Sequence, residues 1–103
     1  MTKIFISQPM RGKTDKEILS ERNRAIKVIQ ETISEEDIEI IDNFLKKEIP
    51  TRVNEQLWYL GESLMILSTA DIAYFVKGWD KARGCKIEHE CAVQYGLKTI
   101  EEE

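Results

Sequence analysis

The sequence predicts one α/β domain with a mostly parallel sheet covered by helices. Its 103 residues, 42% of them hydrophobic, suffice for one core and leave no room for a second domain, so residues 1–103 form a single unit. Segments with strand character alternate with segments of helical spacing in the order β-α-β-α-β-α-β. Such alternation implies parallel strands joined by right-handed crossovers, with helices on the faces of the sheet.

The first half of the chain supplies two strands and a helix. Lys3–Ser7 (KIFIS) is rich in β-formers, and the loop 8–13 that follows contains Pro and Gly. Thr14 and Glu17 have the spacing of a capping box, and apolar residues then recur at helical spacing, so we expect a helix from about 15 to 33. Arg22 falls on its inner stripe, which predicts a buried or half-buried ion pair, with contact to a ligand as the alternative. A short strand at 38–41 and an irregular connection at 43–50 follow.

The second half predicts two helices and two strands. Apolar spacing indicates a helix from about 52 to 68, with more apolar surface than one stripe needs, which favours a partner subunit over a broad core-facing helix. The run 71–76 (DIAYFV) is typical of a central parallel strand. A loop at 77–83, a helix at 84–95 with Gly96 at its C′ position and a strand at 97–100 complete the domain.

Composition and charge exclude several classes of protein. With 15 Lys and Arg against 19 Asp and Glu, the chain is not a nucleic-acid polymer binder, and no apolar run approaches the ~18 residues of a membrane span. The N-terminus leads directly into a strand, so we expect no signal peptide and a cytoplasmic protein. Cys85 and Cys91, about 9 Å apart along a helix, are too distant for a disulfide. One His and two Cys cannot complete a structural zinc site, and we expect no metal and no cofactor.

Two loops are the expected binding region, because ligands of open parallel sheets bind at the carboxyl ends of strands. The loop at 77–84 places three cations and Trp79 before a helix N-terminus, which favours anions. Trp79 could stack on a base or sugar, or it could close the edge of the core beside ordinary solvated cations. Arg11 and Gly12, after the first strand, suit a bidentate phosphate contact, with a plain surface arginine as the alternative.

Acidic residues near these loops are the candidate catalytic groups. Glu88 is predicted to face the small, apolar side of its helix, where an unpaired carboxylate is costly and has a raised pKa. The alternative is that Glu88 bonds N–H groups in the first turn of its own helix. Asp71 opens the third predicted strand and Asp80 lies in the following loop; either could be a turn residue instead.

A family resemblance comes from two stretches, KIFISQPMRGK and ADIAYFVKGWDKARGCKIEHECAVQYG. They resemble small DUF4406-type proteins, mostly bacterial and phage-encoded, related to nucleoside 2-deoxyribosyltransferases and deoxynucleoside monophosphate N-glycosidases. The resemblance implies a Rossmann-like (flavodoxin-like) three-layer sandwich with a mostly parallel sheet of four to five strands. It also implies a homodimer or higher homo-oligomer with sites near the subunit interface.

The resemblance assigns roles to particular residues. Gly84 to Glu88 fits a G-x-x-x-E spacing, which makes Glu88 the nucleophile toward the anomeric carbon, and Arg11 with Gly12 matches a phosphate-binding turn. Asp71 matches an acidic residue that opens the third strand. The polar residue that relatives carry before the glycine is replaced here by Ala82 and Arg83, and the chain stops one strand early, without the C-terminal segment that some transferases use.

The expected function is cleavage of a nucleoside or nucleotide N-glycosidic bond, or deoxyribosyl transfer, since a carboxylate stabilises an oxocarbenium-like state and can trap it. Asp80 or His89 could protonate the leaving base. The alternative is a binding protein that captures a nucleotide or nucleotide-derived signal without turnover. Besides the catalytic candidates Glu88, Asp71 and Asp80, the expected substrate-binding residues are Ser7, Gln8, Pro9, Met10, Arg11, Gly12, Gly78, Trp79, Arg83, Gly84 and His89.

Overall fold

The computed structural model describes residues 1–33, 37–43 and 48–103. Within them the predicted alternation of strands and helices is confirmed, and the part of the expected connection at 44–47 lies outside the described residues. The elements in chain order are β1 (Thr2–Ser7), α1 (Asp15–Thr32), β2 (Ile38–Ile40), α2 (Glu55–Leu67), β3 (Ile72–Phe75), the 3-10 helix η1 (Trp79–Lys81), α3 (Arg83–Gln94) and β4 (Lys98–Glu101).

The four described strands form one parallel sheet in the order β2-β1-β3-β4. The central strands end at the same level, because Ser7 of β1 pairs with Phe75 of β3. From β1 the chain winds toward β2, whereas from β3 it winds toward β4 on the other side. The gap between the ends of β1 and β3 is therefore the topological switch point, the place where open sheets of this type bind ligands.

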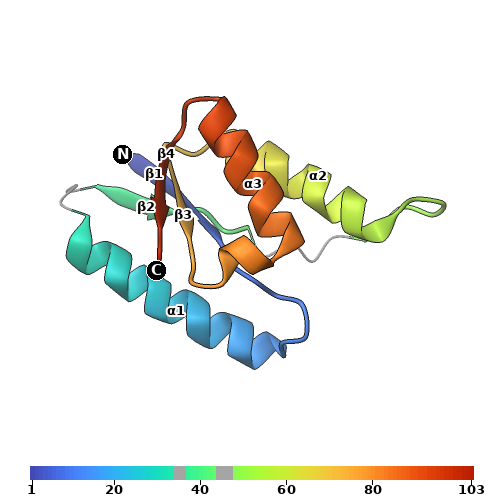
Figure 1. Ribbon diagram of the computed structural model, residues 1–103, viewed down its shortest axis with the longest axis horizontal. Coiled ribbons are helices and arrows are strands. Elements are labelled where there is room, and N and C mark those ends of the chain that lie inside the picture. Colours follow the sequence, from blue (N-terminus) through green and yellow to red (C-terminus); the bar gives the residue numbers. More distant parts are fainter. Residues whose placement is uncertain (34–36, 44–47) are drawn as a thin grey trace.

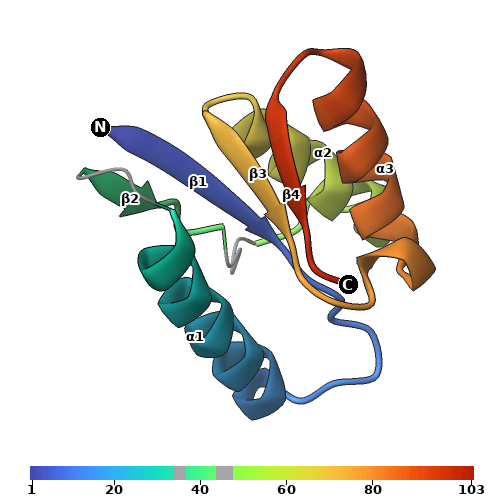
Figure 2. The same ribbon diagram turned by 60° about the vertical axis from the view of Figure 1, so that its left-hand side comes forward.

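Helices cover both faces of the sheet and give three layers. Figures 1 and 2 show α1 on one side of the strands and α2 with α3 on the other. Alternate side chains of β1 point to opposite faces of the sheet. Ile4 and Ile6 pack in the core on the α1 side, with Ala25 and Ile29. Phe5 packs in the core on the side of α2 and α3. Two-sided burial accounts for the unbroken apolar run of β3. The result is a small α/β domain compatible with a Rossmann-like fold.

The starts of α1 and α2 are set by side chains that cap their first backbone N–H groups. At α1 the capping box is present: Glu17 N–H donates to Thr14 Oγ1 and Thr14 N–H donates to Glu17 Oε1, each at 3.1 Å. The predicted start of the next helix at residue 52 is wrong by three residues. Asn54 is the N-cap of α2, its side chain accepting from Leu57 N–H, and Arg52 has a φ of +61°, which is not helical.

Arg22 of α1 is buried, as predicted; its hydrogen bonds go to neutral oxygens, and the negative charge of Asp42 also acts on it. Its guanidinium donates to Asn43 Oδ1 at 2.8 Å and to the Ile41 carbonyl at 2.7 Å. Asn43 in turn donates to the Ile6 carbonyl at 2.9 Å. Neutral oxygens thus satisfy the buried guanidinium, and the contacts tie α1 to the carboxyl ends of β1 and β2.

Part of the apolar surface of α2 packs against the core through Leu64 and Ile66, and part of it stays exposed. Only Leu67 of this helix is buried, while Leu57 and Met65 are 64% and 67% exposed. The core therefore does not account for these side chains, and the oligomer remains a prediction. None of the described helices is both long and apolar enough to cross a membrane.

Candidate functional site

A cavity of about 1170 Å³ opens at the carboxyl ends of β1 and β3. Its walls come from the end of β1 and the loop after it, the start of α1, one side of α2, and the segment from Gly78 into α3. The cavity therefore occupies the switch point of the sheet, where the sequence placed the two candidate loops. The residues that line it are Ile6, Ser7, Gln8, Pro9, Met10, Arg11, Asp15, Ile18, Asn43, Asn54, Gln56, Leu57, Tyr59, Leu60, Ser63, Gly78, Lys81, Ala82, Arg83, Gly84, Cys85, Ile87 and Glu88.

Glu88 lies in the cavity wall and is only 8% exposed. Ser7 Oγ, at the end of β1, donates to Glu88 Oε1 at 2.6 Å, and Ser63 Oγ of α2 donates to Oε2. Each carboxylate oxygen thus accepts one hydroxyl, and three separate elements fix the group. The inward orientation predicted from helical spacing is confirmed, and the hydrogen bonds go to serines rather than to the first turn of its own helix.

The surroundings of Glu88 favour its protonated form. Burial raises the pKa of this carboxyl above its ordinary value, and the hydrogen bonds from Ser63 and Ser7 oppose that shift only in part. No ion pair joins Glu88 to a Lys, Arg or His of the described chain. A carboxylate that lacks a balancing cation inside a cavity is a marker of a functional site.

Cys85 lies one turn before Glu88 and is also buried in the cavity wall. Burial raises the pKa of its thiol to about 11, so the sulfur is protonated at neutral pH and is a poor nucleophile or metal ligand. Cys85 and Cys91 are both free, which confirms the prediction that they form no disulfide. Among the described residues, no three His, Cys, Asp or Glu side chains gather as metal ligands do.

Cations surround the cavity in which Glu88 lies. Arg11, Lys81 and Arg83 line it, and all three are exposed. Arg83 donates to Gln56 Oε1, whereas Arg11 has no hydrogen bond or ion pair with any residue in the described part of the chain. Ala82, the N-cap residue of α3, makes no side-chain capping bond, so the first backbone N–H groups of this helix receive no hydrogen bond from their cap. This rim can hold an anionic group of a ligand.

Most of the predicted substrate-binding residues meet at the cavity. The structure brings together, in its walls, Ser7, Gln8, Pro9, Met10, Arg11, Gly78, Arg83 and Gly84 with Glu88. The predicted residues outside the walls are Gly12, Asp71, Trp79, Asp80 and His89. The candidate nucleophile and the candidate phosphate ligand therefore line the same cavity, although they lie far apart in sequence.

Trp79 and His89 pack against each other instead of facing the cavity. Their rings stack with centroids 4.2 Å apart, and Phe75 contacts the His89 ring edge-on at 4.8 Å. His89 Nε2 lies 3.1 Å from Glu101 Oε2. Trp79 thus covers the edge of the core, which was the alternative to base stacking, and Asp80 is exposed in η1.

Asp71 lies at the amino ends of the central strands, opposite the cavity. Its carboxylate accepts the Lys3 N–H at 2.8 Å, immediately before β3 begins. The cavity is at the other end of that strand, roughly 13 Å farther along at the rise of an extended chain. The structure therefore separates Asp71 from Glu88 and gives it a local contact between β1 and β3.

Residues of α2 are the part of the site that sequence reasoning missed. Gln56, Tyr59 and Ser63 all line the cavity, and Ser63 holds the catalytic candidate directly. Their separations of three and four residues put them on one face of a helix. That polar stripe within an apolar helix is the signal that could have identified them.

The comparison with protein families gives a match over nearly the whole chain. The model of the family described as Domain of unknown function (DUF4406) covers residues 2–101. The chain belongs to the DUF4406 family. No curated protein and no solved structure matches it. The family description names no activity, so the geometry of the cavity is the basis for assigning one to this DUF4406 chain.

Proposed function

We propose that this chain cleaves the N-glycosidic bond of a nucleoside or nucleotide, by hydrolysis or deoxyribosyl transfer, with Glu88 as the nucleophile. The supporting observation is a buried carboxylate held at both oxygens by Ser7 and Ser63, with no balancing cation among the described residues, in a cavity at the switch point of the sheet. A carboxylate fixed in this way suits attack on an oxocarbenium-like carbon, because its position is set before the substrate binds.

In the proposed reaction, one Glu88 oxygen bonds to the anomeric carbon as the carbon–nitrogen bond to the base breaks. The bonding electron pair leaves with the base, which takes a proton from solvent. Water or a second base then attacks the same carbon, losing a proton to solvent, and the ester bond to Glu88 breaks to restore the carboxylate. Asp80 and His89 lie outside the cavity walls, so neither is assigned as the acid.

The rim of the cavity supports a phosphorylated substrate. Arg11 is exposed and has no partner in the described part of the chain, Lys81 lies on the same rim, and the uncapped start of α3 adds backbone donors. Guanidinium groups and free N–H groups both favour phosphate. A nucleoside 5′-monophosphate, with its phosphate at the rim and its sugar at Glu88, is the substrate class that matches this arrangement.

The test is release of free base from deoxynucleosides and their 5′-monophosphates, followed by chromatography. We expect Glu88→Gln to lower the rate by about a thousandfold or more, because the amide cannot form the covalent intermediate. Glu90→Gln is the matched control, since Glu90 is exposed on the same helix, outside the cavity wall, and accepts a hydrogen bond from Gln94 one turn away. Equal base release by wild type and Glu88→Gln would contradict the assignment.

The pH dependence gives an independent prediction. Attack requires ionised Glu88, so base release should decline as the pH falls through the raised pKa of this group. The Ser63 hydroxyl lowers that pKa, and Ser63→Ala should therefore move the acid limb of the kcat/KM profile to higher pH. Ser68→Ala, at the exposed end of α2, is the control and should leave the limb in place. An unchanged pH profile in Ser63→Ala would contradict the role of Glu88 as the group whose ionisation controls base release.

A second candidate function is capture of a nucleotide without turnover. It is favoured by the placement of Asp80 and His89 outside the cavity walls and by Ala82 and Arg83 before Gly84, which leave the leaving base without an assigned acid. The same experiment distinguishes the two functions. Thermal stabilisation by a nucleotide, with no base released from any substrate, would favour capture.

A further inference from the structure

Gln8 carries a buried hydrogen-bond acceptor that the fold does not use. It follows Ser7 at the end of β1, lines the cavity and is 5% exposed. Its Nε2 donates to the Ile18 carbonyl of α1 at 3.0 Å. Its Oε1 is buried and accepts a hydrogen bond from no residue in the described part of the chain.

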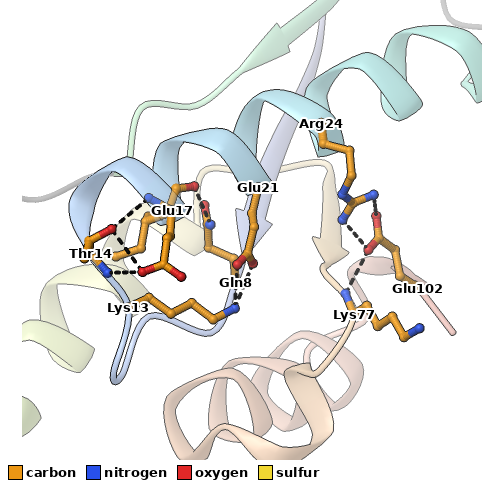
Figure 3. A network of polar contacts seen from close by, with 9 residues as sticks. Gln8, Lys13, Thr14, Glu17, Glu21, Arg24, Lys77 and Glu102 are labelled. Atoms are coloured by element: carbon orange, nitrogen blue, oxygen red, sulfur yellow. Dashed lines mark hydrogen bonds and ion pairs between the residues drawn. The ribbon is translucent and has the colours of Figure 1, made fainter.

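The orientation of this amide is fixed by its neighbour. Exchanging the nitrogen and the oxygen would set Oε1 against the Ile18 carbonyl oxygen, so the nitrogen must remain on that side. Figure 3 shows Gln8 beside the first turns of α1, with this one bond drawn. Nearly all buried polar atoms in proteins have a partner, and one without a partner calls for an explanation.

We propose that Gln8 is a specificity-determining residue, whose Oε1 accepts a hydrogen bond from an O–H or N–H group of the bound nucleoside or nucleotide. The inference rests on the proposed function. Ser7, the preceding residue, holds Glu88, the group proposed to bond the anomeric carbon, and Ser7, Gln8 and Glu88 all line the same cavity. The groups near that carbon are the sugar hydroxyls and the donors of the base.

Selection follows from the unpaired state of the oxygen. A ligand with a donor satisfies Oε1, whereas an analogue without the donor leaves it buried and unpaired. Sites built in this way reject the analogue more strongly than an apolar pocket rejects a missing methylene. Solvent does not reach Oε1, so the donor enters as side chains of the wall adjust, a common response to binding.

The experiment measures binding rather than turnover. The four common deoxynucleoside 5′-monophosphates are ranked by calorimetry, and the best binder is compared with two analogues, one lacking the 3′-hydroxyl and one lacking the base amino or imino donor. For wild type we expect one of these deletions to weaken binding by about tenfold or more. The deletion with the large effect identifies sugar or base as the source of the donor.

The same comparison in Gln8→Met isolates the residue. Met has a similar length and no comparable acceptor, so the sensitive deletion should weaken its binding by no more than about twofold. Gln94→Met, at an exposed position of α3, should keep the wild-type ratio of the two dissociation constants, that of the analogue to that of the complete nucleotide. Wild-type ratios near one for both analogues, or an undiminished ratio in Gln8→Met, would overturn the role of Gln8 and leave the proposed function intact. Failure of every nucleotide to bind would overturn both.

Discussion

Glu88 and Glu102 are two carboxylates near the carboxyl ends of the strands, with different hydrogen-bond partners. Glu102 follows β4 and accepts hydrogen bonds from the Tyr74 hydroxyl at 2.5 Å, the Lys77 N–H at 2.8 Å and the Arg24 guanidinium at 2.9 Å. Figure 3 shows Arg24 of α1 and the Lys77 backbone converging on it. Within the described part of the chain, Glu88 accepts hydrogen bonds from two serine hydroxyls alone, and it faces a cavity.

The pKa values of the two groups shift in opposite directions. Burial raises the pKa at both sites, but at Glu102 the hydrogen bonds from Arg24, Tyr74 and Lys77 outweigh it and the pKa is lowered. At Glu88 burial outweighs the two serines and the pKa is raised. A carboxylate with a cationic partner therefore stabilises the fold, whereas one without a cationic partner destabilises it and is free to act on a ligand.

The largest effect on stability is expected for Glu102→Gln. Loss of the charge weakens four hydrogen bonds, two of them from Arg24, and the ion pair with Arg24, and should lower the free energy of unfolding at neutral pH by about 1–3 kcal/mol. Because the folded pKa is depressed, this contribution is present above the ordinary value of 4.5 and disappears as the pH falls through the folded value. Urea unfolding at several pH values measures it, and curves for wild type and variant that fail to converge in acid would contradict the assignment.

Glu88→Gln should have the opposite sign. The folded pKa of Glu88 lies above the ordinary value of 4.5, so wild-type stability is highest below that value and declines as the pH rises through the folded pKa. The amide has no charge to bury, and the variant should be more stable than wild type by about 1 kcal/mol at pH 8, with no gain at pH 4. A loss of stability at pH 8 would show that the two sites do not differ as described.

The smallest effect is expected for Asp71→Asn, at the far edge of the sheet. The amide oxygen can still accept the Lys3 N–H, and the position is exposed, so the free energy of unfolding should change by no more than about 0.5 kcal/mol. Base release should stay within about twofold of wild type, because Asp71 does not line the cavity. A large loss of activity with normal unfolding would return Asp71 to the site.

The order of elements could be predicted because it depends on local patterns. The capping box at Thr14 and Glu17 set the start of α1, and Gly96, with a φ of +76°, follows the end of α3 as predicted. The inward face of Glu88 followed from helical spacing. The start of α2 was harder to predict, because the hydrogen bond from Leu57 N–H to Asn54 decides it, whereas the apolar pattern already begins at Val53.

Contacts between distant segments could not be predicted. The sequence gives no reason to pair Ser63 with Glu88, or Glu102 with Arg24, because each pairing depends on how helices pack across the sheet. Asp71 was selected by its place before a strand, a pattern that also fits a residue bonding the adjacent strand. Trp79 was ambiguous for a similar reason, since an indole beside a loop serves a core edge as readily as a ligand.

The protonated thiol of Cys85 has a practical consequence for studying this chain. With its pKa near 11 and its sulfur enclosed, it should react slowly with alkylating reagents, whereas the partly exposed Cys91 should react first. A single fluorophore can therefore be attached at Cys91, on the same helix as Glu88, without altering any side chain in the cavity wall. The chain thus contains a natural attachment point from which ligand entry can be followed optically.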